Sequence, residues 1–96
     1  MVYSISYDLK NPGYDYSSLI EAIKSYGTWW HQTPAVWLIV SNQSAAVIRD
    51  NLMKYLDRND VLFVVALKRE WAAVGFKSNE YSWLKSIPNE NWDGID

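Results

Sequence analysis

The sequence predicts an α/β domain of the α+β kind, with one sheet that carries its helices on a single face. Residues 2–9 alternate between apolar and polar side chains, which is typical of a half-buried strand. Residues 15–26 and 44–57 carry apolar side chains at helical spacing. The apolar runs 36–40 and 61–67 are short and rich in β-branched residues, which favours strands.

The first strand, residues 2–9, places its odd-numbered side chains on one face and its even-numbered side chains on the other. The odd face is apolar and is expected to meet the helices, whereas the even face carries two serines and Asp8. Asn, Pro and Gly follow in residues 10–13 and predict a turn. Asp8 therefore lies at the C-terminal end of the strand, a common position for ligand chemistry in α/β sheets.

The helix at 15–26 is expected to take Asp15 as its N-cap and Gly27 as the residue after its C-terminus. A two-stranded hairpin follows over 28–41. Pro34 is expected in its turn or at a bulge, because proline cannot donate a hydrogen bond to a central ladder.

Ser44 is the expected N-cap of the second helix, and the apolar strand 61–67 is expected near the centre of the sheet. A short additional C-terminal strand is predicted at 71–76, and a short helix at 78–87 ends at Pro88. The first six elements follow the ferredoxin-like βαββαβ plan. This plan leaves one sheet face for solvent, a ligand or a second subunit.

The composition fits one small packed domain, because 49% of the 96 residues are hydrophobic and 16% are aromatic. We assign residues 1–87 to this domain and residues 88–96 to an acidic, disordered tail. Eight basic and seven acidic residues give residues 1–77 a net charge of +1. One lysine against four acids gives residues 78–96 a net charge of −3. This balance does not favour strong nucleic-acid binding.

Cysteine is absent, which excludes disulfides and thiolate metal sites. No apolar run approaches the ~20 residues of a membrane helix, and the N-terminus lacks the pattern of a signal peptide. We therefore expect a cytoplasmic protein with no membrane contact.

The six tryptophans include the neighbours Trp29 and Trp30, which cannot both face one side of a strand. At least one of them is therefore expected at the surface or at an interface. Exposed aromatic rings stack on bases of single-stranded nucleic acid or anchor protein interfaces, and we favour the interface. Basic side chains that would add nucleic-acid contacts are Lys10, Lys54 and Arg58, although the last two also suit a solvated helix face.

Asp8 alone would be a poor metal site, because Mg²⁺ commonly takes one or two carboxylates together with water and phosphate. A two-fold dimer would supply a second carboxylate by bringing two Asp8 side chains together. The alternative is that Asp8 caps the turn that follows it. His31, the only histidine, is interpreted as a packed strand residue rather than a catalytic base.

Three segments also suggest a family: Tyr7-Asp8-Leu9, Tyr26-Gly27, and QTPAVW at 32–37. Over residues 1–76 the chain resembles the Cas-two family of small CRISPR adaptation proteins and, more loosely, the virulence-associated protein D toxins. The resemblance implies a homodimer. It further implies a metal-dependent endonuclease that cleaves RNA or DNA, with Asp8 as catalytic residue and as ligand of Mg²⁺ or Mn²⁺. Other members of the family act only as scaffolds.

Two functions therefore stay open. The first is a Cas-two-like nucleic-acid-processing homodimer that uses Asp8. The second is a non-catalytic binding or scaffold module of the same fold, which engages a protein partner through an aromatic surface. The position of Asp8 favours the first function, and the near-neutral charge of residues 1–77 favours the second.

Overall fold

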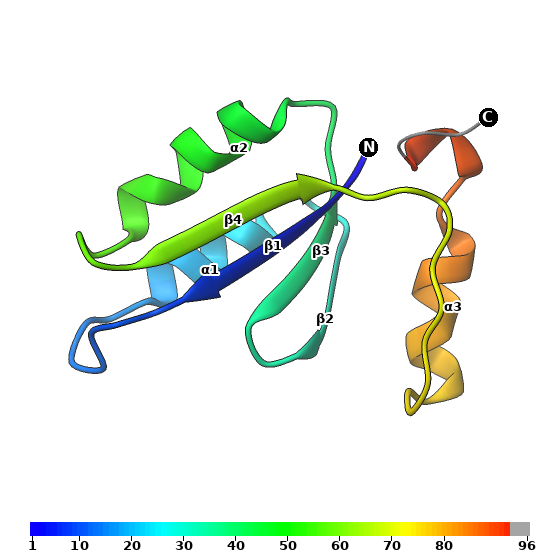
Figure 1. The fold of residues 1–96 in the computed structure, drawn as a ribbon, viewed down its shortest axis with the longest axis horizontal. Helices are drawn as coiled ribbons and strands as arrows, with labels where there is room; N and C mark the ends of the chain where they lie inside the picture. The colour runs from blue at the N-terminus through cyan, green and yellow to red at the C-terminus, as the bar shows by residue number, and fades with distance from the viewer. Residues whose placement is uncertain (93–96) are drawn as a thin grey trace.

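The computed structural model describes residues 1–92, which form an α+β domain with one four-stranded antiparallel sheet (Figure 1). The strand order is β2-β3-β1-β4. The elements in chain order are β1 (Val2–Asp8), α1 (Ser17–Lys24), β2 (Trp29–Thr33), β3 (Val36–Val40), α2 (Ala45–Leu52), η1 (Met53–Tyr55), β4 (Val61–Ala66), α3 (Ser78–Ser86) and η2 (Asn89–Asn91). The predicted α+β class is therefore confirmed.

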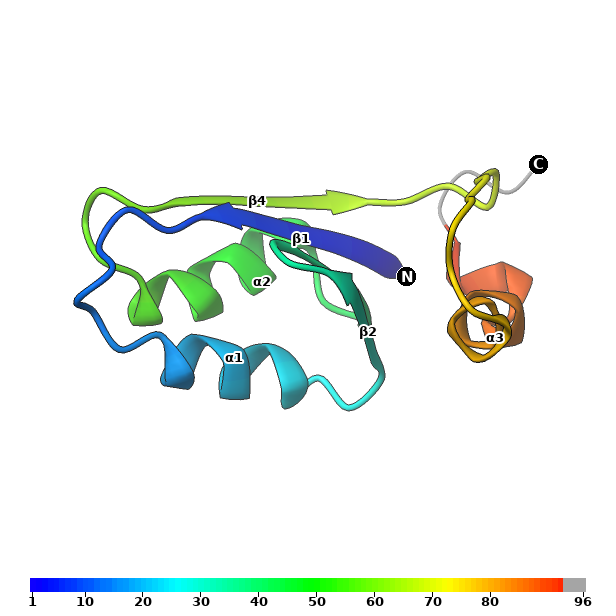
Figure 2. The same ribbon diagram turned by 90° about the horizontal axis from the view of Figure 1, so that it is seen from below.

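Helices α1 and α2 lie together on one face of the sheet (Figure 2). The register pairs Tyr3 with Ile39 and Ile5 with Trp37, so the odd-numbered side chains of β1 face these helices as predicted. The buried cluster between sheet and helices consists of Tyr3, Ile5, Leu19, Ile23, Trp37, Ile39, Ile48 and Leu52. The opposite face, which carries the even-numbered side chains of β1, is here called the open face.

Helix α3 corrects the expectation that every helix lies on one side of the sheet. It lies apart from α1 and α2 at one end of the molecule (Figures 1 and 2). Its Leu84 packs in a second buried cluster with Val2 and Leu38 of the open face, together with Trp30, Ile87 and Trp92. Apolar side chains at this end of the open face need cover from water, and α3 and the residues after it supply that cover.

Three further expectations are wrong. The additional C-terminal strand at 71–76 is absent: residues 69–77 have no regular structure, and Gly75 has a φ of +95° that interrupts extended backbone. Strand β4 lies at the edge of the sheet rather than at its centre. Residues 88–92 are ordered, because η2 forms and the Trp92 side chain is buried in the second cluster; residues 93–96 lie outside the described part.

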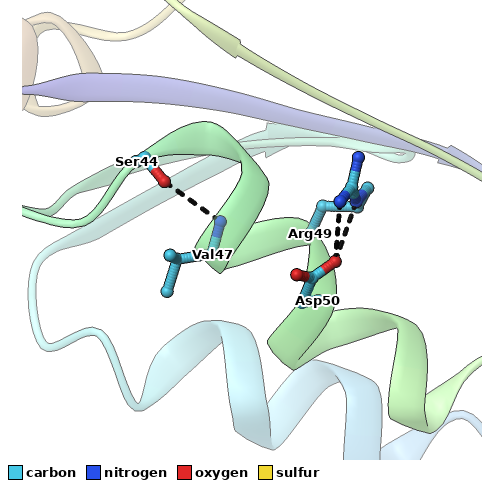
Figure 3. Close-up of polar contacts among 4 residues, drawn as sticks. All are labelled: Ser44, Val47, Arg49 and Asp50. Carbon is cyan, nitrogen blue, oxygen red and sulfur yellow. Dashed lines mark hydrogen bonds and ion pairs between the residues drawn. The ribbon is translucent and has the colours of Figure 1, made fainter.

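Local signals for the helix ends are partly confirmed. Ser44 caps α2 by accepting a hydrogen bond from the Val47 amide at 3.2 Å (Figure 3). Gly27 has a φ of +94° and donates its amide to Lys24, but it lies two residues after the C-cap Ser25 rather than directly after the helix, because α1 ends earlier than predicted. Asp15 lies one residue before the N-cap position of α1 and instead accepts from the Ser17 amide. That hydrogen bond lowers the pKa of Asp15.

Within residues 1–92, the helices are all too short or too polar to cross a lipid bilayer.

Candidate functional site

Asp8 ends β1 on the open face, where the sequence places it. Its side chain is 63% exposed, and its carboxylate lies 2.7 Å from the ammonium group of Lys10. The hydrogen bond and the charge of Asp8 raise the pKa of Lys10. Both partners are largely in water, where such a pair is easily opened. In a single copy, the carboxylate of Asp8 is therefore paired with the Lys10 side chain, yet it stays accessible.

A metal centre needs more ligands than one copy of Asp8 supplies. Among residues 1–92 there is no cluster of three or more His, Cys, Asp or Glu residues that would hold a metal ion. Any Mg²⁺ or Mn²⁺ at Asp8 therefore requires oxygen ligands from a second chain, from water or from a phosphate. The Asp8 hypothesis thus depends on an assembly larger than one chain.

Asp60, which is not among the residues predicted from the sequence, stabilises the loop that follows Asp8. Its carboxylate accepts from the backbone amides of Lys10 and Asp57, both at 2.7 Å, and from the Tyr16 hydroxyl at 2.7–2.8 Å. The bond from Asp57 is local, but Lys10 and Tyr16 lie 50 and 44 residues away, so the sequence around Asp60 does not indicate these two donors. Asp60 therefore ties both ends of the β1–α1 loop to the turn before β4.

The hydrogen bonds at Asp60 also determine its ionisation. Burial alone would raise the pKa of Asp60, but the bonds from Lys10, Tyr16 and Asp57 outweigh it and hold the pKa below the ordinary value. Burial, together with the hydrogen bond to Asp60, raises the pKa of the Tyr16 phenol. The ionised carboxylate is thus the form that the folded chain favours.

We expect the Asp60→Asn variant to be less stable than the wild type at pH 7 and to approach the wild type at pH 3. A carboxyl whose pKa is lowered by folding stabilises the fold above its ordinary pKa of 3.8, and this contribution is lost as the pH falls through the folded value. Urea unfolding at both pH values measures the difference in the free energy of unfolding between the variant and the wild type. Asp50→Asn, at an exposed pair with Arg49, is the control and should match the wild type throughout. If the loss of stability in Asp60→Asn is the same at pH 7 and pH 3, the ionised Asp60 carboxylate does not stabilise the fold as proposed.

The open face presents an apolar row on β4. Val61, Phe63 and Val65 are 52%, 61% and 37% exposed, and they lie across from Asp8, Ser6 and Ser4 in the register. β4 is an edge strand, so an apolar row and an unpaired strand edge occur together. The register between β4 and β1 is continuous over six pairs, and none of the six residues of β4 is charged or is proline. Such an edge and face favour association with another chain.

The residues predicted to contact nucleic acid do not form one surface. Trp30 is buried against the second cluster, whereas the exposed Trp29 lies on the opposite side of the strand, with its ring 5.3 Å from that of Trp37. His31 stacks on the same Trp37 ring at 3.7 Å and pairs with the Val36 carbonyl, as expected of a packed residue.

The predicted basic contacts, Lys10, Lys54 and Arg58, lie in the β1–α1 loop and in the segment between α2 and β4. These two segments are tied together by Asp57 and Asp60. The same two segments and the end of β1 also carry four carboxylates, those of Asp8, Asp15, Asp57 and Asp60. Three cations among four anions do not make a basic patch that would attract a phosphate backbone.

Comparison of the chain with known protein families and with solved structures gave no match.

Proposed function

We propose that the chain is a non-catalytic binding module that works as a homodimer through the open face of its sheet. The observation that supports this most directly is the exposed apolar row of Val61, Phe63 and Val65. An apolar row on a sheet face is stabilised when a second surface removes it from water. The exposed aromatic side chains Trp29 and Trp71 remain available to a protein partner of this dimer.

We further propose that the fold is ferredoxin-like. The order β1-α1-β2-β3-α2-β4 and the sheet order β2-β3-β1-β4 support this assignment, and so does the position of α1 and α2 on one face. In this plan the second face of the sheet is the surface left for assembly, and here α3 covers only one end of it.

Sedimentation velocity of the wild type over a range of micromolar concentrations tests the proposal. The expected result is a dimer that dissociates on dilution, because an isologous interface forms by mass action. A monomer throughout that range would overturn it.

A second candidate is a Cas-two-like, metal-dependent endonuclease, and the position of Asp8 favours it. Asp8 is exposed, lies at the end of β1, and shares the open face with Ser4 and Ser6. If two open faces meet about a two-fold axis, two Asp8 carboxylates approach each other, and a cation between them would relieve their repulsion. Mg²⁺ or Mn²⁺ held there would orient a phosphodiester of RNA or DNA and activate a water molecule.

For this second candidate we expect Asp8→Asn to abolish cleavage of RNA or DNA while the fold and the dimer persist. The substitution preserves size but removes the charge that a metal ion requires. Asp50→Asn is a closely matched control, because Asp50 is 61% exposed and is also paired with a cation, Arg49, at 2.8 Å. Cleavage by the Asp8 variant at the wild-type rate, or equal loss in both variants, would reject the assignment.

A further inference from the structure

A cavity of about 230 Å³ lies between the β2–β3 hairpin, α3 and the irregular segment that follows β4. Aromatic rings from three parts of the chain line it: Trp30 on β2, Trp71 and Phe76 in the irregular segment, and Trp92 after η2. These rings lie apart from Asp8 and from the exposed row on β4. The cavity nevertheless borders the open face, because Leu38 and Leu67 also line it.

Three of the aromatic rings that line the cavity are held by contacts within the chain. The indole N–H of Trp30 donates to the Glu80 carbonyl at 2.8 Å, and Phe76 meets the Trp30 ring edge-on at 5.2 Å. Trp92 is almost fully buried. Ala72 and Ala73 line the same space with only a methyl group each, so no side chain on that side is long enough to fill it.

The size of the cavity and its aromatic lining indicate which class of ligand fits. An apolar cavity of about 150 Å³ accepts benzene, so this larger space admits a two-ring system of the size of indole. Aromatic walls favour an aromatic ligand, through offset and edge-to-face contacts. The Trp30 N–H already has a partner, and no buried side-chain nitrogen or oxygen of residues 1–92 lacks one. The cavity therefore provides shape and ring contacts rather than an internal polar anchor.

We propose that this cavity is a binding site for a small planar aromatic molecule. Lys68 and Glu70 also line it and are exposed, so they form the charged part of its mouth. A polar substituent on the ligand would point toward this mouth, where water and both charges are available. The site goes beyond the proposed dimer, and it adjoins the open face at Leu38.

Titration of the ¹⁵N-labelled full-length protein with indole tests the proposal, because each tryptophan gives its own indole N–H signal. We expect saturable shifts at Trp30, Trp71 and Trp92, which line the cavity, and none at Trp29 and Trp37, which lie on the other side of the sheet. The signals are assigned by single Trp→Phe variants. No shift up to millimolar indole, or shifts centred on Trp29, would overturn the proposal. Cyclohexanol that binds as tightly as indole would contradict the aromatic ligand class.

A cavity-filling variant separates this site from non-specific binding. Ala73→Leu is expected to weaken indole binding by about tenfold or more, because the added side chain occupies the space of the ligand. Val74→Leu is the control. Val74 is the next residue after Ala73, but its side chain is almost fully exposed and does not line the cavity. Unchanged Trp29 and Trp37 signals in the Ala73→Leu variant show that its fold persists. If Ala73→Leu does not fold, Ala72→Leu is used in its place. Equal affinity in the filled and control variants would overturn the site.

Discussion

The Phe63→Asp variant is expected to sediment as a monomer at concentrations where the wild type is a dimer. Phe63 has the most exposed side chain of the apolar row on β4, and it lies opposite Ser6 on this edge strand of the open face. In a dimer formed through this face, the new carboxylate would be buried without a partner. Removing a charge from water in this way is costly enough to disrupt a small interface.

The control for this experiment is Val74→Asp, which also adds a carboxylate at an exposed apolar side chain. Val74 is 91% exposed and lies in the irregular segment, off the sheet. It should leave the dimer intact. Sedimentation velocity, together with circular dichroism to verify the fold, measures both variants. If Phe63→Asp still forms the dimer, the interface lies on another surface, and the proposed role of the open face is wrong.

Trp37→Ala is expected to lower the free energy of unfolding by about 3–5 kcal/mol, the usual cost of truncating a large buried aromatic residue. Trp37 is 2% exposed in the cluster between sheet and helices. Its indole N–H donates to the Tyr7 hydroxyl at 2.9 Å, and the His31 ring stacks on it at 3.7 Å. The substitution therefore removes packing, a hydrogen bond and a stacked pair together. The free energy of unfolding of a small domain is only about 5–15 kcal/mol, so this substitution would remove a large fraction of it.

Urea unfolding measures this loss, with Trp71→Ala as the matched control. Trp71 loses the same atoms, but its side chain is partly exposed in the irregular segment, so its replacement should cost much less. Similar losses for the two tryptophans would show that Trp37 does not organise the core in the way its contacts indicate.

Side-chain alternation was enough to predict which face of β1 meets the helices. Tyr3 and Ile5 are buried against α1 and α2, and Asp8 lies on the other face, as their spacing indicates. The cap at Ser44 was also predictable, because it depends on one residue type and its immediate neighbours. Features that depend on local chemistry could thus be read from the sequence.

The position of β4 could not be predicted in the same way. A continuous apolar run is typical of a strand covered on both faces, yet Val61, Phe63 and Val65 are exposed in a single chain. A hydrophobic segment predicts that its side chains will be buried. It does not predict whether they are buried by the same chain or by a second one. The burial of Trp30 was likewise unpredictable, because it depends on α3, about 50 residues further along the chain.

The segment 71–76 illustrates how tertiary contacts override a local preference. Its aromatic and β-branched residues favour a strand, but Phe76 packs edge-on against Trp30, and Gly75 turns the backbone before it. Asp60 illustrates the opposite case, because a residue with no periodic signal accepts hydrogen bonds from two distant groups, Lys10 and Tyr16, as well as from the nearby Asp57 amide. Such convergence appears only once the topology is known.

Because β1 lies between β3 and β4, this strand cannot complete its pairing until synthesis has passed Ala66, the partner of Tyr3. Closing so long a loop is slow compared with pairing between neighbours in the sequence. Until then, one edge of β1 is unpaired, and the uncharged segment VLFVVA is not yet hydrogen-bonded to it. Two nascent chains in proximity can pair these strands with each other instead. Reducing the number of chains in synthesis at one time should therefore raise the yield of correctly folded protein.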